Sequence, residues 1–299
     1  MSIQWIFDTK TKTKTNIKPK IKGQVSSRTQ TVLCLRNPWV TDSVFMGKTY
    51  TAMTVIFAAF DYSILFHAHT HNLLENADLF LIGLILGPFI FTPFLAYRII
   101  FIKKLSNIYL NRETKKIYYQ RFRKNITFDW NNIGGGIFAR TEFGGASFST
   151  SYALAFAPRR EDGSLHKMDC LWIDSNEPTE PSAHYVAEVW EYLRHFMDHG
   201  LDKLPPPDES NWWHRPLEAI CLTPSEAWRH YAPWRTGEPG EMQGKKLWQL
   251  PFWAVLFPYN FSLAVCWYLI CRLFNVQAAP APPEAFEDAP TQPGKRKRK

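Results

Sequence analysis

The chain contains 299 residues, of which 45% are hydrophobic and 21% are charged, and its formal net charge is +8. A negative mean hydropathy of −0.26 excludes a polytopic helical bundle, because such a protein is apolar along most of its length. The charge does not indicate nucleic-acid binding, because the lysines gather beside apolar runs and in the ending GKRKRK, where basic residues orient membrane segments and contact anionic lipid.

Residues 1–48 are predicted to form a basic segment in the cytoplasm. No apolar stretch follows the early lysines, so the segment is not a cleavable signal peptide, and the first apolar run must itself direct insertion. The cysteines are odd in number and form no C-x-x-C pair, so neither disulfides nor a structural zinc is expected; they are Cys34, Cys170, Cys221, Cys266 and Cys271.

Residues 49–102 predict a transmembrane hairpin with spans at about 49–69 and 79–102. Each run reaches the roughly 20 residues that a helix needs to cross the hydrocarbon core. The loop between them has no Lys or Arg, whereas Lys48, Lys103 and Lys104 flank the hairpin. The positive-inside rule therefore places the loop outside the cytoplasm and the following soluble domain inside it, at a bacterial inner membrane.

One carboxylate, Asp61, falls inside the first predicted span. A charge at that depth is costly and usually faces a partner or a water-filled cavity. Counting inward from both ends of the hairpin, Asp61 lies level with Gly87 and Pro88, and too deep to pair with Arg98. A structural role beside backbone loosened by Pro88 is the first interpretation, and an ion or proton pathway is the alternative.

Small residues recur four apart on both predicted spans, which lets helices approach closely. They are Gly83 and Gly87 on the second span, and Ala59 and Ser63 on the first. Packing within the hairpin is the preferred interpretation, and homodimerisation is the alternative.

Three histidines, at 67, 69 and 71, alternate at the outer end of the first span. An interfacial polar cap explains them most simply, and a zinc or copper site is the alternative. No metal or other cofactor is predicted.

Residues 103–204 predict a β-rich domain closed by one helix. Strand patterns occur at 107–112, 117–122, 126–130, 136–140, 149–157 and 167–173. Apolar residues recur at helical spacing over 183–199, and Gly200 suits the end of that helix. The glycines at 134–136 precede a predicted strand, so they predict a turn or bulge and not a phosphate-binding loop.

Residues 205–250 predict a Pro- and Trp-rich linker. Thr223-Pro-Ser-Glu226 has capping-box spacing and predicts a short helix to about His230. An aromatic group either packs on the soluble domain or the membrane interface, or forms a docking surface for a protein partner; it comprises Trp212, Trp213, His214, Trp228 and Trp234.

Residues 251–274 predict a third span, with Lys245 and Lys246 as its cytosolic anchor. The Pro-rich, basic and disordered tail at 275–299 would then end outside. If the third run is re-entrant or lies in the interface, the tail stays in the cytoplasm.

The order of strands and a final helix over 105–200 resembles the pleckstrin-homology-like domains of bacterial membrane proteins. The segments YLNRETKKIYY at 109–119, FDW at 128–130, WEYLRHFM at 190–197 and LPPP at 204–207 are similar to a family of Gram-negative membrane proteins of unknown function, often found among type VI secretion genes. This resemblance implies an effector, an immunity protein or an adaptor.

The sequence thus predicts an α+β membrane protein that acts by binding, because no catalytic motif occurs in a coherent context. Its expected partners are the bilayer and a secretion effector or machinery component. The alternatives are a pore-forming toxin that depends on Asp61, and a sensor of anionic lipid that uses Arg121, Arg123 and Lys124.

Overall fold

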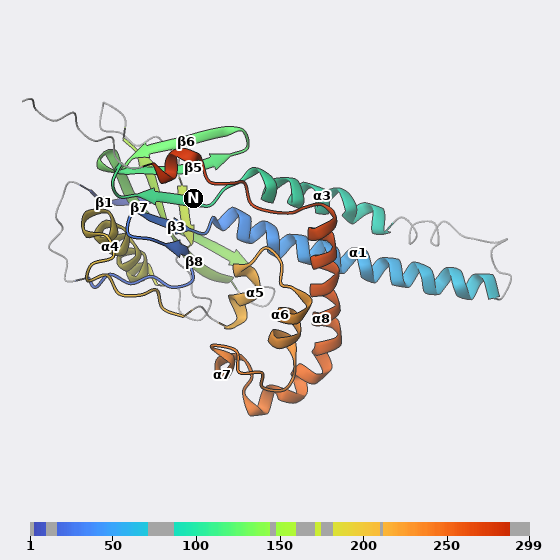
Figure 1. Cartoon of the computed structure of the whole chain (residues 1–299). Coiled ribbons are helices and arrows are strands. Elements are labelled where there is room, and N and C mark those ends of the chain that lie inside the picture. Colours follow the sequence, from blue (N-terminus) through green and yellow to red (C-terminus); the bar gives the residue numbers. More distant parts are fainter. Residues whose placement is uncertain are drawn as a thin grey trace, which may run out of the picture. The chain divides into compact units, whose positions relative to one another are not determined.

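The computed structural model describes residues 3–9, 17–70, 87–143, 148–159, 171–174, 182–209 and 212–287, and it shows a mixed α+β chain (Figure 1). The chain forms two compact units. The first, here called the sheet unit, comprises Met1–Pro38, Leu105–Ser210 and Ala279–Lys299. The second, the helix unit, comprises Trp39–Lys104 and Asn211–Ala278.

A 5-stranded antiparallel sheet has the order β2-β3-β4-β5-β6. Its strands are β2 (Val25–Arg28), β3 (Val32–Leu35), β4 (Ile108–Asn111), β5 (Lys116–Arg121) and β6 (Lys124–Asp129). The sequence predicted β4 to β6 but assigned no strands to residues 1–48. β2 and β3 were missed because they are short and β3 pairs with a distant strand, with Leu35 opposite Ile108. Everything between β3 and β4 is therefore an excursion between neighbouring strands.

A 4-stranded sheet has the order β1-β7-β8-β9. Its strands are β1 (Ile3–Asp8), β7 (Ile133–Phe143), β8 (Phe148–Pro158) and β9 (Leu171–Asp174). Glycines 134–136 lie inside β7, so a turn at this point is wrong. The predicted alternative of a bulge agrees with the register shift between Trp5 and Phe7 of β1, opposite Gly136 and Gly135. A Cβ at Gly136 would come 2.6 Å from the carbonyl oxygen of Gln4, and one at Gly135 would come 2.7 Å from the ring of Trp190. The glycines thus let β1 and a helix approach the strand closely.

That helix is α4 (Ala183–His199), which has the predicted bounds. The Ser182 hydroxyl accepts a hydrogen bond from the His184 N–H at its start, and Gly200 ends it with a φ of 73°. Trp190 is buried and stacks with Phe7 at 5.5 Å and with Trp130 at 5.4 Å between ring centroids. The apolar stripe of α4 therefore closes the core of the sheet unit, as its spacing predicted.

The long helices of the helix unit are α1 (Pro38–Thr70), α3 (Gly87–Lys104) and α8 (Leu250–Leu273). Two stretches, Pro38–Ile64 and Leu247–Leu273, are long and apolar enough to cross a membrane. The predicted span at 79–102 lies partly outside the described residues. The shorter elements are η4 (Trp212–His214), α5 (Arg215–Glu218), α6 (Pro224–Tyr231), α7 (Glu241–Gly244) and η5 (Leu247–Gln249).

After α8 the chain returns to the sheet unit. The Ala279 N–H donates to the Leu105 carbonyl at 2.9 Å, and Asn111 Nδ2 donates to the carbonyls of Ala285 and Glu287 at 3.1 and 2.9 Å. A short helix, η6 (Pro283–Phe286), lies in this segment, where Ala285 is completely buried. The prediction of a disordered tail is therefore wrong up to residue 287. The composition of this segment favours disorder, but Asn111 of β4 holds its backbone by hydrogen bonds at Ala285 and Glu287. Residues 288–299 lie outside the described chain.

Candidate functional site

The aromatic segment that follows residue 211 folds into a packed layer on α8. Trp212 is completely buried and stacks on His230 at 4.2 Å between ring centroids. A Cβ at Gly244 would lie 1.7 Å from Cδ1 of Trp212, so this glycine makes room for the indole. The prediction that Trp212 belongs to a partner surface is wrong, because its side chain is internal. Predicted as a linker, this segment instead has a core of its own.

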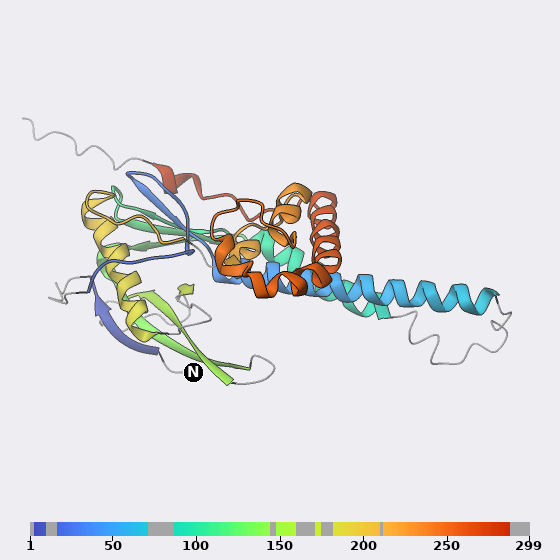
Figure 2. The same cartoon turned by 90° about the horizontal axis from the view of Figure 1, so that it is seen from below.

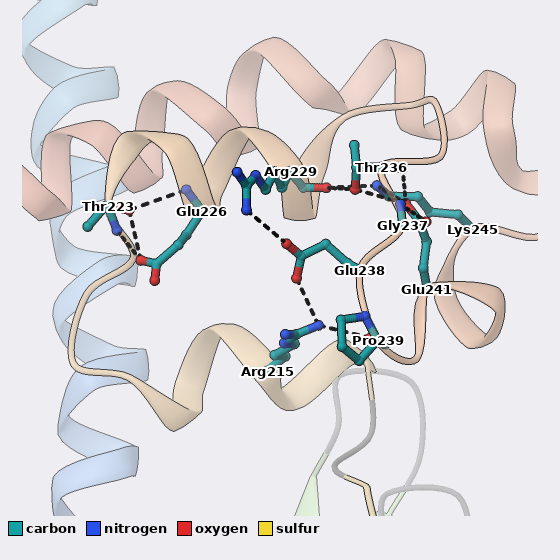
Figure 3. A network of polar contacts seen from close by, with 10 residues as sticks. All are labelled: Arg215, Thr223, Glu226, Arg229, Thr236, Gly237, Glu238, Pro239, Glu241 and Lys245. Atoms are coloured by element: carbon teal, nitrogen blue, oxygen red, sulfur yellow. Dashed lines mark hydrogen bonds and ion pairs between the residues drawn. The ribbon is translucent and has the colours of Figure 1, made fainter.

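Lys245 and Glu241 form a buried ion pair (Figure 3). Lys245 Nζ lies 5.2 Å from the centroid of the Trp212 ring and donates to Glu241 Oε1 at 2.8 Å. It also donates to the carbonyls of Arg229 and Trp234, at 2.9 and 3.1 Å. The side chain of Lys245 is 0% exposed, so it cannot serve as the predicted cytosolic anchor. Its charge instead organises the loop between α6 and α7.

Glu241 fixes the same loop from the other side of the ion pair. Its carboxylate accepts hydrogen bonds from the N–H groups of Thr236 and Gly237, at 2.7 and 2.9 Å (Figure 3). Burial raises the pKa of Glu241, but the hydrogen bonds from Lys245, Thr236 and Gly237 outweigh burial and lower the pKa overall. The hydrogen bonds of Lys245 and Glu241 thus stabilise the loop between α6 and α7, which is the role of a structural ion pair.

His230 is buried beside this pair. Burial, followed by the positive charge of Lys245, lowers the pKa of His230 to about 3. The neighbouring phenol of Tyr231 has its pKa raised to about 12 by burial. Both side chains stay uncharged near pH 7, which suits a core position better than proton transfer.

Salt bridges and a cap hold the outer edge of this layer (Figure 3). The Glu238 carboxylate forms salt bridges with Arg215 at 3.0 Å and with Arg229 at 4.0 Å. The predicted capping box is confirmed, because the Thr223 hydroxyl accepts from the Glu226 N–H while the Glu226 carboxylate accepts from the Thr223 N–H. Charged groups thus lie on α5, α6 and the loop that follows α6.

The remaining tryptophans of the predicted partner surface are half-exposed. Trp213 stacks on Trp253 of α8 at 5.5 Å, and Trp228 contacts Phe257 at 4.9 Å between ring centroids. Trp234 also contacts Phe257, at 5.9 Å. The side chain of His214 lies outside what the structure describes. Each of these tryptophan rings thus packs on α8 and keeps 42–51% of its residue surface exposed.

The outward side of α8 continues this accessible surface with large apolar side chains. We call this set the α8 outer face; it comprises Phe252, Val255, Tyr259, Leu269 and Leu273, which are 48–78% exposed. The inward side, with Trp253, Ala264, Trp267 and Cys271, is buried. Exposed apolar surface of this extent marks a protein or membrane contact.

α8 meets α1 at a compact junction. Trp267 packs against Gly47, and its Nε1 donates to the Ile220 carbonyl at 2.7 Å. Lys48 Nζ donates to the Pro216 carbonyl at 2.6 Å, so protein covers α1 at this level. In both views α8 runs across α1 and not alongside it (Figures 1 and 2).

Asp61 is 8% exposed, and its Oδ1 atom has no hydrogen-bond partner within the described ranges. Aromatic ring contacts show which levels of α1 and α3 lie side by side. The ring centroids of Tyr50 and Phe94 are 5.6 Å apart, and those of Phe57 and Phe91 are 5.4 Å apart. Continuing this alignment brings Asp61 level with the start of α3, in agreement with the counting from sequence. A buried carboxylate in a helix that is long and apolar enough to span a membrane is a candidate functional site.

The small residues and histidines predicted to be important in the hairpin are only partly described by the structure. Ala59 and Ser63 are exposed, so the contacts between α1 and α3 that the structure describes are made by aromatic rings and not by this small face. Gly87 begins α3. Gly83, the side chain of His69, and His71 lie outside the described part of the chain, so the predicted small-residue pairing and polar cap stay predictions.

In the sheet unit, the three cations predicted to contact lipid surround one turn. Arg121, Arg123 and Lys124 are exposed where β5 joins β6, and Phe122, which is 42% exposed, adopts a φ of 57° at its tip. Arg121 forms a β-bridge with Leu105, the residue that follows α3. An apolar tip ringed by cations suits contact with an anionic surface.

Residues 84–288 match a family of unknown function, DUF6708. No curated protein and no solved structure matched the chain. Across the residues that the structure describes, no three His, Cys, Asp or Glu side chains come together as metal ligands. The candidate site comprises the exposed apolar surfaces and the buried carboxylate of Asp61.

Proposed function

The chain belongs to the family of unknown function DUF6708, and we propose that it is a membrane-anchored binding protein that acts without catalysis. Since the function of the family is unknown, the proposal rests on the residues of the chain itself. The observation that carries this proposal is the exposed apolar surface of α1 and α3. On α1 it includes Met53, Val55, Ile56, Phe60, Tyr62 and Phe66; on α3 it includes Phe89, Ile90, Phe94, Tyr97 and Ile100. In water such a surface would drive aggregation, whereas in lipid it is the ordinary exterior of a span.

In this proposal α1 and the segment ending with α3 cross the bilayer as a hairpin. Lys48 is covered by protein, so the lipid-facing part of α1 begins beyond it. Lys103 and Lys104 end α3 at the cytosolic headgroups of a bacterial inner membrane, following the positive-inside rule. The sheet unit then lies in the cytoplasm.

The sheet unit is the partner-binding part of this proposal. Following the resemblance to proteins found among type VI secretion genes, its pleckstrin-homology-like fold would bind a secretion effector or machinery component, as an immunity protein or adaptor does. Capture of the full chain from detergent-solubilised membranes of its own host tests this. Recovery of a secretion component supports the role, and a chain that remains in the soluble fraction after lysis contradicts the membrane anchor.

A second candidate function, a membrane-active toxin, is favoured by one observation, the buried carboxylate of Asp61. Expression in a bacterial host should then arrest growth and depolarise the membrane, and Asp61→Asn should abolish both effects. Asp42→Asn, at an exposed position near the start of α1, is the matched control. Healthy, polarised cells expressing the native chain exclude this role.

A third candidate, a sensor of anionic lipid, is favoured by the cationic turn between β5 and β6. In nanodiscs, anionic lipid should raise the unfolding temperature of the native chain. A variant with Gln at positions 121, 123 and 124 should lose this gain, while Lys116→Gln should keep it. Equal gains in both variants argue against this role.

A further inference from the structure

α8 satisfies the length and hydropathy requirements of a membrane span, but the way its two ends are held does not fit a single crossing. Before α8, the Asp208 N–H donates to the Ile21 carbonyl at 2.8 Å, which fixes residue 208 in the sheet unit. After α8, the Ala279 N–H donates to the Leu105 carbonyl at 2.9 Å, in the same unit.

One folded unit lies on one side of a membrane, so the chain that leaves and re-enters it must cross an even number of times. The excursion between β3 and β4 meets this requirement in the proposed hairpin, where α1 and the segment that ends with α3 cross out and back. Among its described residues, 208–209 and 212–279, the excursion between Asp208 and Ala279 holds one helix long enough to span, within Leu247–Leu273. A single crossing by α8 would separate residues 208 and 279, which the sheet unit holds together.

The surroundings of α8 lead to the same conclusion. Trp228 of α6 contacts Phe257 and Phe261, near the middle of α8. α6 also carries Glu226 and Arg229. If α8 crossed the bilayer, these charges would lie near its centre, where one charged side chain costs at least about 2.5–3.5 kcal/mol.

We infer that α8 is an interfacial helix, lying in the membrane plane with its outer face at the boundary between headgroups and acyl chains. This inference rests on the proposed membrane anchoring by the α1–α3 hairpin. It explains why α8 runs across α1 in both views, since a helix in the plane crosses a helix that passes through it (Figures 1 and 2). The C-terminus then lies on the same side as the sheet unit.

The chemistry of α8 fits a lipid surface. Its outer face exposes Phe252 at 72%, Val255 at 78% and Leu273 at 78%. Aromatic residues, including Trp248 at 75% and Tyr259 at 48%, gather on the same helix and beside it, as at membrane interfaces. The exposed cations Lys246 and Arg272 flank the two ends, where they can reach phosphate groups.

The first test is the side of the C-terminus in the native chain. A C-terminal epitope tag is added to one copy and a tag between residues 203 and 204, in the sheet unit, to another. Protease is then applied to intact spheroplasts and to inverted vesicles. The inference expects both tags to be cleaved from the same side. Cleavage from opposite sides overturns it and leaves the proposed anchoring intact.

The second test measures depth along α8. The cysteines are replaced by serine, and an environment-sensitive fluorophore is attached to single cysteines at 255, 262, 269 and 273 of the chain in nanodiscs. The inference expects a uniform shallow depth, and the inward position 264 is the matched control. A maximum near the middle of α8 would indicate a span, and water-like emission throughout would indicate a protein partner or free surface; either overturns the inference. Failure of the chain to enter membranes at all overturns the proposed function as well.

Discussion

Trp267 of α8 lies against Gly47 of α1 with no side chain between them. A Cβ at Gly47 would come 2.5 Å from Cη2 of the indole, closer than carbon atoms approach without displacement. Trp267 is completely buried and is also held by its hydrogen bond to Ile220. The crossing of the two helices therefore depends on a glycine at this turn of α1.

Gly47→Leu should disrupt the crossing of α1 and α8. The new side chain must displace Trp267, and overpacking of this kind costs about 1–3 kcal/mol or more. Thermal unfolding of the detergent-solubilised chain, followed by tryptophan fluorescence, should show a lower midpoint. Ala59→Leu, on an exposed part of the same helix, is the matched control. Equal midpoints for the two variants would show that the contact contributes little.

Lys245→Met should destabilise the helix unit strongly. The substitution leaves the carboxylate of Glu241 buried without its cation, and breaking a buried pair in this way costs about 3–5 kcal/mol. Denaturant unfolding measures the loss. Lys246→Met changes the exposed neighbour and should be close to neutral. The double variant with Glu241→Gln should recover part of the loss; no recovery would contradict the pairing.

Stability should fall as the pH falls from about 6.5 toward about 3, because of His230. The pKa of His230 is lowered from 6.5 to about 3 in the folded chain, by burial and then by Lys245. Within that window the unfolded chain binds a proton that the folded chain does not, and each pH unit then removes up to about 1.4 kcal/mol. Above pH 6.5 this contribution is complete.

Unfolding free energies measured at several pH values test this dependence. His230→Phe should flatten the slope between pH 6.5 and 4.5, above the range in which the lowered pKa of Glu241 adds a slope of the same sign. His184→Phe, at an exposed position of α4, should leave the slope unchanged. A slope that persists in His230→Phe would assign the pH dependence to other groups.

Asn111→Ala should release the segment that follows α8. Asn111 is 1% exposed, and its Nδ2 donates to the carbonyls of Ala285 and Glu287. Its Oδ1 accepts from the N–H groups of Glu113 and Thr114 at 2.9 and 3.0 Å, so the substitution removes the partner of one buried backbone group, the Ala285 carbonyl, and of three part-buried ones.

Limited proteolysis with mass spectrometry should then detect faster cleavage within residues 280–287 of Asn111→Ala than of the native chain. Asn125→Ala, on the exposed edge strand β6, is the control and should be cleaved at the native rate. An unchanged cleavage pattern in Asn111→Ala would show that the segment is held by its other contacts.

Local patterns in the sequence were sufficient to predict the elements that are stabilised by interactions between residues close together in the chain. The strands β4 to β6 were predicted from aromatic and β-branched residues separated by polar breaks, and α4 from its apolar spacing, with Gly200 at its end. The capping box of Thr223 and Glu226 was also predicted, because its partners lie three residues apart. Such features are fixed by interactions within a few residues.

The tertiary structure decided what pairs across the chain. β3 joins β4 across the whole α1–α3 excursion, Gly135 and Gly136 sit inside β7 to admit Trp190 and β1, and Trp212 is internal. None of these follows from local composition, because each depends on a partner far away in sequence.

The apolar run at 251–274 shows most clearly which properties follow from the sequence and which depend on the tertiary structure. The sequence by itself determined that this segment is a long apolar helix, since hydropathy and length are local properties. Whether such a helix crosses a bilayer depends on where its two ends are held. Only the tertiary structure ties Asp208 and Ala279 into one unit, through hydrogen bonds to Ile21 and Leu105 that no local pattern encodes.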